Sequence, residues 1–180
     1  MRFTDHLMRA EDVIDALGLV PHPEEGGFYR ETYRSKSVFP PGAPFSGERS
    51  IGTAIYFLLT ASTFSEMHRL PGDEVFHFYL GDPVDMLLLC PDGRGQTLTL
   101  TSDLSLGRPQ ILVPGGVWQG SRLRSGGTFA LLGTTMGPGF AFSDYESGTP
   151  ALLESYPEYA EAIATLLGTA DDENRGGDAT

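Results

Sequence analysis

Two histidines and two acidic residues lie close together in the middle of the chain. The stretch MHRLPGDEVFHFYLG, residues 67–81, contains His68, Asp73, Glu74 and His77. Imidazole nitrogens and carboxylate oxygens are common ligands of transition metals. A histidine beside a carboxylate can also exchange protons near neutral pH, because the imidazole titrates there. These residue types therefore indicate a metal site or an acid–base pair, and a merely polar strand is the third interpretation.

Strand alternation separates the two histidines. If this stretch forms a β-strand, alternate side chains share a face. Glu74 then points into the interior with Phe76 and Phe78, and His77 points to the opposite face unless a β-bulge intervenes. We therefore expect His68 and Glu74 to form the site. His77 is expected to be a hydrogen-bonded histidine at a sheet or subunit contact.

Short apolar runs and turn signals predict the scaffold that positions these residues. Between residues 51 and 142, β-rich runs alternate with turns that contain Gly or Pro, at a spacing typical of an all-β sandwich or barrel. Phe28–Arg34 is predicted to be an earlier strand with alternating faces. One helix is expected near each end, at Ala10–Leu17 and at Pro157–Leu167.

Composition limits the classes of partner. Acidic residues (24) outnumber basic ones (12), which gives a net charge of −12. Such a chain is poorly suited to non-specific binding of nucleic acid or to anionic membranes. The N-terminus lacks the apolar run of a signal peptide, and no run reaches the length of a membrane span. We expect a cytoplasmic protein whose ligand is a small molecule.

The chain is expected to form a single domain. Its 180 residues suffice for one hydrophobic core, and no internal repeat or linker divides them. The domain is predicted to cover residues 1–168. The polar, acidic sequence at 169–180 is predicted to be a disordered tail.

The spacing around His68 resembles the first motif of the cupin superfamily. That motif runs glycine, five residues, His-x-His, three or four residues, Glu, six residues, Gly. In this chain His68 takes the first histidine position, Glu74 the glutamate and Gly81 the closing glycine. Leu70 replaces the second histidine, and Ser62 replaces the leading glycine. The spacing therefore fits throughout, while one ligand position is lost.

The second cupin motif is present in part. It contains Pro-x-Gly, two residues, His, three residues, Asn. Here Pro114 and Gly116 supply the turn, Gln119 stands at the histidine position and Leu123 at the asparagine position. A second ligand position has therefore become an amide.

Several further segments resemble one group of small single-domain cupins to which no common reaction is assigned. They are EGGFYRETYRS at 25–35, SIGTAIYFLLT at 50–60, MHRLPGDEVFHFYLGDPV at 67–84, LVPGGVWQGSRL at 112–123 and GTTMGPGFAFSDYE at 133–146. The resemblance covers roughly residues 8–168. It implies an all-β fold, a cupin-type double-stranded β-helix or jelly-roll barrel, and a homodimer. Sugar-nucleotide 3,5-epimerases form a related cupin branch, which is an analogy at the level of the fold.

The substitutions weaken a metal site. The full cupin site uses three histidines and a glutamate, whereas this chain offers His68, Glu74 and the amide of Gln119. An amide oxygen is a poor ligand for late transition metals. We therefore expect either no cofactor or a weakly bound divalent metal at these three residues.

The favoured function is that of an isomerase or epimerase acting on a polar, sugar-like or carbonyl substrate. His68 would move the proton, Glu74 would orient its ring and Gln119 would polarise the substrate. The expected substrate-binding residues are Arg30, Tyr33, Tyr56, Glu66, Phe76 and Phe78. A metal-dependent, dioxygenase-like cupin with a degenerate site remains an alternative, as does a small-ligand-binding protein without chemistry.

Overall fold

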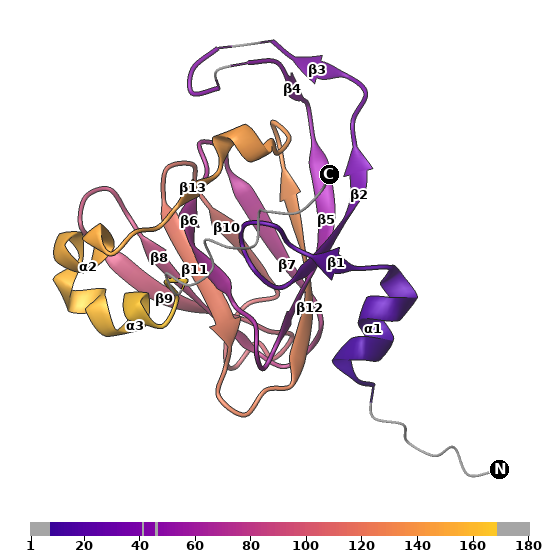
Figure 1. Ribbon diagram of the computed structural model, residues 1–180, viewed down its shortest axis with the longest axis vertical. Helices are drawn as coiled ribbons and strands as arrows, with labels where there is room; N and C mark the ends of the chain where they lie inside the picture. The colour runs from indigo at the N-terminus through magenta and orange to yellow at the C-terminus, as the bar shows by residue number, and fades with distance from the viewer. Residues whose placement is uncertain (1–7, 41, 46, 169–180) are drawn as a thin grey trace, which may run out of the picture.

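The chain folds into two antiparallel β-sheets that pack face to face, with short helices at the periphery (Figure 1). The computed structural model describes residues 8–40, 42–45 and 47–168. Its jelly-roll arrangement confirms the predicted all-β cupin fold. The predicted tail at 169–180 lies outside the described residues. Within the described part, no helix is long and apolar enough to cross a membrane.

Six strands form the first sheet, five the second and two a separate arm. In spatial order, the first sheet contains β1 (Val20–Pro21), β2 (Phe28–Arg34), β5 (Thr53–Thr60), β12 (Phe129–Met136), β7 (Glu74–Gly81) and β10 (Gln110–Val113). The second contains β13 (Glu146–Ser147), β6 (Ser65–Arg69), β11 (Trp118–Leu123), β8 (Val84–Leu89) and β9 (Gly95–Leu100). The arm consists of β3 (Val38–Phe39) and β4 (Arg49–Ser50), and it extends beyond the sheets at the top of Figure 1.

The two ends of the chain form the helices. Helix α1 (Ala10–Leu17) has the predicted bounds, and Gly18 ends it with a left-handed φ of 60°. The single helix predicted at the C-terminal end is instead α2 (Ala151–Ser155), the 3₁₀ turn η2 (Pro157–Tyr159) and α3 (Ala160–Ala164). Pro157 explains the break, because proline disfavours a helical conformation in the residue before it.

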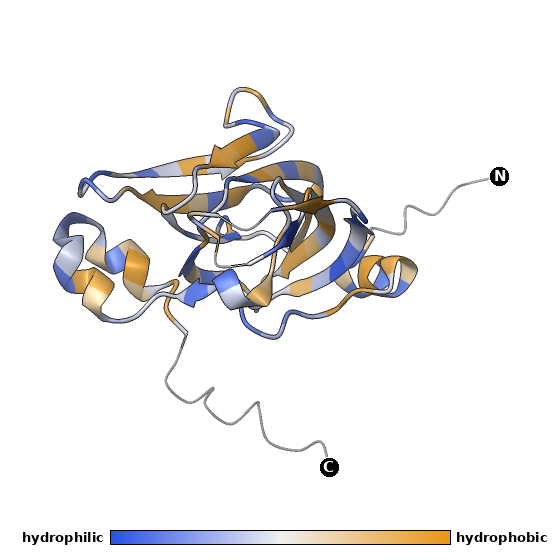
Figure 2. Cartoon of the chain, turned by 90° about the horizontal axis from the view of Figure 1, so that it is seen from above, coloured by the Kyte–Doolittle hydropathy of each residue, from blue (hydrophilic) through white to orange (hydrophobic). Residues whose placement is uncertain are grey.

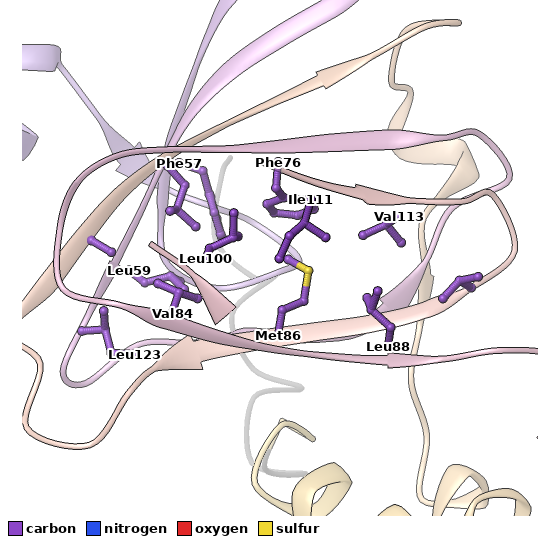
Figure 3. Packing of buried hydrophobic residues seen from close by; sticks show 13 residues of the cluster. Phe57, Leu59, Phe76, Val84, Met86, Leu88, Leu100, Ile111, Val113 and Leu123 are labelled. Atoms are coloured by element: carbon purple, nitrogen blue, oxygen red, sulfur yellow. The ribbon is translucent and has the colours of Figure 1, made fainter. Parts of the chain in front are cut away.

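The main core lies between the two sheets. Figure 3 shows Phe57, Phe76 and Ile111 of the first sheet pointing toward Met86 and Leu88 of the second. Along several strands in Figure 2, hydrophobic and hydrophilic segments alternate, as expected of strands with one buried face. Helix α1 covers a smaller apolar cluster on the outer face of the first sheet, and α2 and α3 cover another on the second.

A β-bulge in β2 changes which side chains face the interior. Glu31 pairs with Ile55 and Tyr33 pairs with Ala54, so Thr32 is an extra residue without a register partner. An extra residue reverses the alternation of all the side chains that follow it.

A second bulge, in β6, has the same effect. Gln119 pairs with His68 and Ser121 with Ser65, so two residues of β6 lie opposite Gly120. Met67, one of those two, packs with the cluster under α2 and α3. A Cβ atom on Gly120 would lie 2.7 Å from the Met67 sulfur, so the glycine leaves room for the Met67 side chain at the bulge.

Candidate active site

A cavity of about 240 Å³ lies at one end of the barrel, bordered by β2, β5, β7 and β12. Its polar lining consists of His22, Glu25, Glu31, Arg34 and Glu74, together with the hydroxyls of Thr53 and Thr134. Aromatic side chains of Tyr29, Phe140 and Phe142 form another part of its wall. The cavity therefore combines several titratable groups with an apolar wall, which is typical of small-molecule sites.

Glu74 is the predicted site residue that lines this cavity. Its side chain is 7% exposed, and Gln119 Nε2 donates a hydrogen bond of 2.8 Å to its Oε2 atom. Burial and, secondly, the nearby Glu25 carboxyl raise the pKa of Glu74 to about 7. His68 and hydrogen bonds from Gln119 and Thr134 act in the opposite direction without cancelling the effect of burial. Glu74 can therefore both accept and release a proton near neutral pH.

Glu25 is a second, half-buried carboxyl that the sequence analysis missed. Ser65 Oγ donates a hydrogen bond to its Oε1 atom. Burial raises the pKa of Glu25 to about 7; the Ser65 hydrogen bond opposes the shift, and the Glu66 charge adds to it. The cavity therefore holds two carboxyls, and ionisation of either one disfavours ionisation of the other.

Two glycines place Glu25 at the cavity. Gly26 and Gly27 adopt φ values of 90° and 69°, which side chains of L-residues rarely adopt. A Cβ atom on Gly26 would collide with the carbonyl oxygen of Phe64, and one on Gly27 would lie 2.8 Å from that of Leu58. The loop therefore lies directly on β5 and the start of β6.

His22 belongs to the same loop and was also missed as a site residue. Its Nδ1 atom accepts hydrogen bonds from the backbone N–H groups of Glu25, at 2.9 Å, and Glu24, at 3.3 Å. Burial, and secondly the charge of His68, lower the pKa of His22 to about 4. At neutral pH the ring is therefore uncharged and carries its hydrogen on Nε2.

His68 lies deeper than the prediction placed it. It is 1% exposed, it does not line the cavity, and its Nδ1 atom is 2.7 Å from the carbonyl oxygen of Glu66. That carbonyl, and not Glu74 as expected, orients the ring. Burial lowers the pKa of His68 despite the opposing charge of Glu74, so the ring is neutral.

Two buried polar atoms beside these groups have no hydrogen-bond partner within the described residues. They are Gln119 Oε1 and the hydroxyl of Tyr145. The Tyr145 ring stacks on His68 with centroids 4.9 Å apart and planes at 17°. Burial raises the pKa of Tyr145, so its hydroxyl stays protonated. An unpaired buried group costs about 1–3 kcal/mol, which a bound molecule could recover.

The β2 bulge places Tyr33 on the outer face of the first sheet, where Arg30 and Tyr56 also lie. The Arg30 guanidinium lies 5.8 Å from the centre of the Tyr56 ring, and Tyr56 packs with the cluster under α1. Tyr33 is 56% exposed. Arg30, Tyr33 and Tyr56 therefore do not line the cavity. Arg34 lines it instead, because the extra residue Thr32 reverses the alternation.

The other expected residues lie close to the site but outside its lining. The β6 bulge takes Glu66 off the face of His68, and Glu66 lines a separate groove beside Gly26. Phe76 is in the main core and Phe78 packs against it. His77 lies on the outer face, as alternation predicts, where Thr135 and Gln110 are its hydrogen-bond partners.

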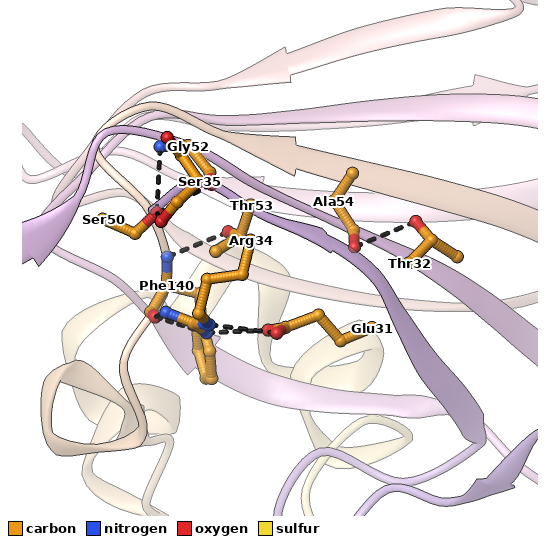
Figure 4. Close-up of polar contacts among 9 residues, drawn as sticks. All are labelled: Glu31, Thr32, Arg34, Ser35, Ser50, Gly52, Thr53, Ala54 and Phe140. Atoms are coloured by element: carbon orange, nitrogen blue, oxygen red, sulfur yellow. Dashed lines mark hydrogen bonds and ion pairs between the residues drawn. The ribbon is translucent and has the colours of Figure 1, made fainter. Parts of the chain in front are cut away.

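The segment 139–147, here called the strap, crosses the end of the barrel and closes one side of the cavity. Figure 4 shows Arg34 between the Glu31 carboxylate and the carbonyl oxygen of Phe140 in the strap. The Phe140 N–H donates to Thr53 Oγ1 at 3.0 Å. These contacts hold the aromatic residues of the strap against the cavity.

Two further arginines bind the strap. Arg49 of β4 forms an ion pair with Asp144 in which both side chains are less than 10% exposed. Arg69 of β6 forms a more exposed pair with Glu146, at 2.7 Å. The strap is therefore held by one arginine from each of the two sheets and one from the arm.

The donor set does not fit the cupin metal centre. Leu70 occupies one histidine position, and the Gln119 amide at another is already bonded to Glu74 through Nε2. Across the described ranges, no three His, Cys, Asp or Glu side chains are placed to hold one ion. The chemistry of this site is therefore considered in terms of its own side chains.

These features define a cupin barrel with a titratable end cavity. Residues 11–148 match the family model described as Cupin superfamily (DUF985), and the chain therefore belongs to this family. No curated protein matches it.

Solved structures agree with this assignment. A protein from Shewanella oneidensis is 38% identical, with a TM-score of 0.81, and the match covers 90% of this chain and 99% of that one. A protein from Leishmania major is 31% identical, with a TM-score of 0.80 and coverage of 89% and 99%. Oxalate decarboxylase from Bacillus subtilis is 13% identical, with a TM-score of 0.50 over 90% of this chain and 38% of its own, and is similar in fold alone.

Proposed function

We propose that the protein is an isomerase-type or epimerase-type enzyme that moves a proton at a carbon atom next to a carbonyl group of a small polar substrate. The observation that carries this proposal is the position of Glu74. It lines the cavity, it is nearly buried, and its pKa is raised to about 7. A general base or acid works best when its pKa lies near the working pH.

In the proposed reaction Glu74 takes the proton of the C–H bond. The electron pair of that bond moves toward the carbonyl group, whose oxygen becomes an enolate. His22 supplies the stabilising donor, because its neutral ring carries hydrogen on Nε2 while Nδ1 is fixed by two backbone N–H groups. Return of the proton to the same carbon on the other face gives the epimer. Where that carbon carries a hydroxyl group, transfer of the hydroxyl proton to the enolate oxygen and return of the first proton to the former carbonyl carbon give the isomer, in which the hydroxyl oxygen has become the new carbonyl.

The second carboxyl supports this role. When one of Glu25 and Glu74 is ionised, its charge raises the pKa of the other, so near neutrality the pair favours holding one proton. The cavity then presents one base and one acid at the same time. His68, first expected to be the base, is in this proposal a neutral neighbour of Glu74 that positions Tyr145 by stacking.

Exchange with deuterated solvent tests the proposal without knowledge of the product. Uncharged and phosphorylated aldoses and ketoses would be incubated with the protein in D₂O, and loss of the proton next to the carbonyl would be followed by NMR. The wild type should catalyse exchange with at least one of them, and Glu74→Gln should exchange it at least about 100-fold more slowly. Glu154→Gln, an exposed substitution on α2, is the matched control. Equal exchange by Glu74→Gln and the wild type would refute the role of Glu74.

We also propose that the chain forms a homodimer. Val38 and Phe39 on the projecting arm are 53% and 42% exposed, and exposed apolar residues that cluster are typical of interfaces. In the described residues β2 pairs with β1 only at Phe28 and Tyr29, which leaves the remainder of that edge available to a second copy. Light scattering on the purified protein tests this, and a monomer at micromolar concentration would contradict it.

A further inference from the structure

The inner part of the cavity is rich in hydrogen-bond acceptors. Glu25 and Glu74 both line it. Gln119, which lies behind Glu74 and does not line the cavity, donates to Glu74 through Nε2 and keeps its Oε1 atom as a buried acceptor without a partner within the described residues. A group that binds between the two carboxyls is therefore favoured if it donates hydrogen bonds.

No positive side chain in the described part neutralises the two carboxyls. The ion pairs of the structure involve neither Glu25 nor Glu74. Arg34, the arginine that lines the cavity, is already paired with Glu31 at 2.7 Å. Both nearby histidine rings are held neutral by burial. A carboxylate that is shielded from water and has no positively charged partner is destabilised, so a bound cation would be favoured here.

The aromatic part of the cavity wall suits an organic cation. Tyr29, Phe140 and Phe142 line the cavity, and aromatic faces attract alkylammonium and guanidinium groups. A bare metal ion has different requirements, since Ca²⁺ takes six to eight oxygen ligands. The combination of carboxyl acceptors and aromatic rings in one cavity favours a small molecule that carries both charge and carbon.

We propose that the substrate of this cavity carries a protonated amino group, which Glu25 and Glu74 receive while the aromatic wall covers its carbon skeleton. This inference rests on the proposed function and narrows its substrate to small aminated carbonyl compounds. The cavity volume of about 240 Å³ sets the size of the ligand to that of a few linked carbon atoms or a single sugar ring.

The test compares three probes of one size that differ in charge: n-propylammonium, 1-propanol and propionate. Met136 lines the cavity, so its methyl group, labelled with ¹³C, reports binding at this site. Propylammonium should shift the Met136 signal with at least a tenfold lower dissociation constant than either other probe. A stronger response to propanol or propionate, an equal response to all three, or no response to propylammonium would overturn the proposal.

Two variants and one ion complete the test. Glu25→Gln keeps the size of the side chain and removes its charge, and it should weaken propylammonium binding at least tenfold. Glu154→Gln on α2 is the control and should bind as the wild type does. Unchanged binding by Glu25→Gln, or a larger Met136 shift with calcium chloride than with propylammonium, would overturn the assignment.

This outcome can be separated from that of the proposed reaction. Deuterium exchange on an uncharged sugar depends on Glu74 but not on an amino group. Exchange without binding of propylammonium would leave the proton transfer standing and refute the aminated substrate. Binding of propylammonium without exchange on any carbonyl compound would support the site for an amino group and refute the proton transfer.

Discussion

Gln119 donates a hydrogen bond to Glu74 across 2.8 Å, and both side chains are less than 10% exposed. Gln119 stands at a histidine position of the cupin motifs and Glu74 at the glutamate position. The residue that replaces a histidine thus fixes the carboxyl of the glutamate by a hydrogen bond. The amide stabilises the ionised form of Glu74, because it donates to the carboxylate. The contact therefore controls the protonation of the group that we propose as the base.

Replacing Gln119 with leucine should raise the pKa of Glu74 above about 7, because one donor to the carboxylate is lost. The measurement is the pH dependence of the Glu74 carboxyl ¹³C signal. Gln96→Leu on β9, which is exposed, is the control for a change of the same kind on a strand. An unchanged or lower pKa in Gln119→Leu would show that the amide has no part in setting it.

Glu74→Gln should gain stability over the wild type as the pH rises. The folded-state pKa of Glu74 is about 7, above its ordinary value of 4.5, so between these values the folded state holds a proton that the unfolded chain has lost. The stabilisation is complete below the lower value and is lost as the pH rises through the higher one. We expect the difference in unfolding free energy to grow by roughly 3 kcal/mol across this window and to level off above it.

Urea titrations at several pH values measure this difference, and Glu154→Gln provides the reference for removing one exposed carboxyl. A difference between the two variants that does not change with pH would contradict the raised pKa of Glu74.

His22→Gln should resist acid better than the wild type. Burial lowers the pKa of His22 from 6.5 to about 4, so between these values the unfolded chain binds a proton that the folded state does not. The wild type therefore loses stability as the pH falls through this window, and the variant lacks that contribution. The slope of the unfolding free energy against pH near pH 5 measures the contribution of His22 directly. Identical slopes for both proteins would show that the ring is protonated in the folded state.

Gly26→Ala should destabilise the protein far more than Gly93→Ala. The two glycines have nearly the same φ, 90° and 89°, so both variants carry the same backbone strain. A Cβ atom on Gly26 would collide with the Phe64 carbonyl, whereas one on Gly93 has nothing within 4 Å. Denaturant unfolding of both variants isolates the effect of the collision. Equal losses would mean that the loop carrying His22 and Glu25 can move off the sheet without cost.

Arg49→Met should lower the melting temperature more than Arg94→Met. Arg49 and Asp144 are less than 10% exposed, whereas Arg94 and Asp92 form a pair at the surface. Removing one partner of a buried pair leaves the other charge without compensation, whereas exposed pairs contribute little. Calorimetry on the two variants makes the comparison. A larger loss in Arg94→Met would mean that the strap does not depend on its arginine contacts.

Local patterns were sufficient to predict much of the scaffold. Helix α1 and strand β2 have the bounds that hydrophobic periodicity indicated, because the capping glycine and the alternation are encoded within each segment. Motif spacing also brought His68 and Gln119 together, since they are register partners in the second sheet. Glu74 completes that group through its bond to Gln119.

The rest of the site depends on contacts between distant segments. His22 and Glu25 reach the cavity because the loop between them and Gly27 lies on β5 and β6, which no periodicity encodes. The pair Gly26-Gly27 directly after Glu25 was the available signal, since adjacent glycines often mark a backbone that must approach closely. The lowered pKa of His68 likewise depends on its burial in the folded chain, which outweighs the charge of Glu74.

The β-bulge at Thr32 reverses the alternation of side chains within β2. Before it, odd-numbered positions such as Tyr29 and Glu31 face the cavity, and after it the even-numbered Arg34 does. If β2 kept all of its residues but ran without the bulge, Tyr33 would face the cavity in place of Arg34, and a phenol would replace a guanidinium at the cavity wall. The charge that β2 presents to the cavity therefore depends on the bulge as much as on the types of residue in the strand.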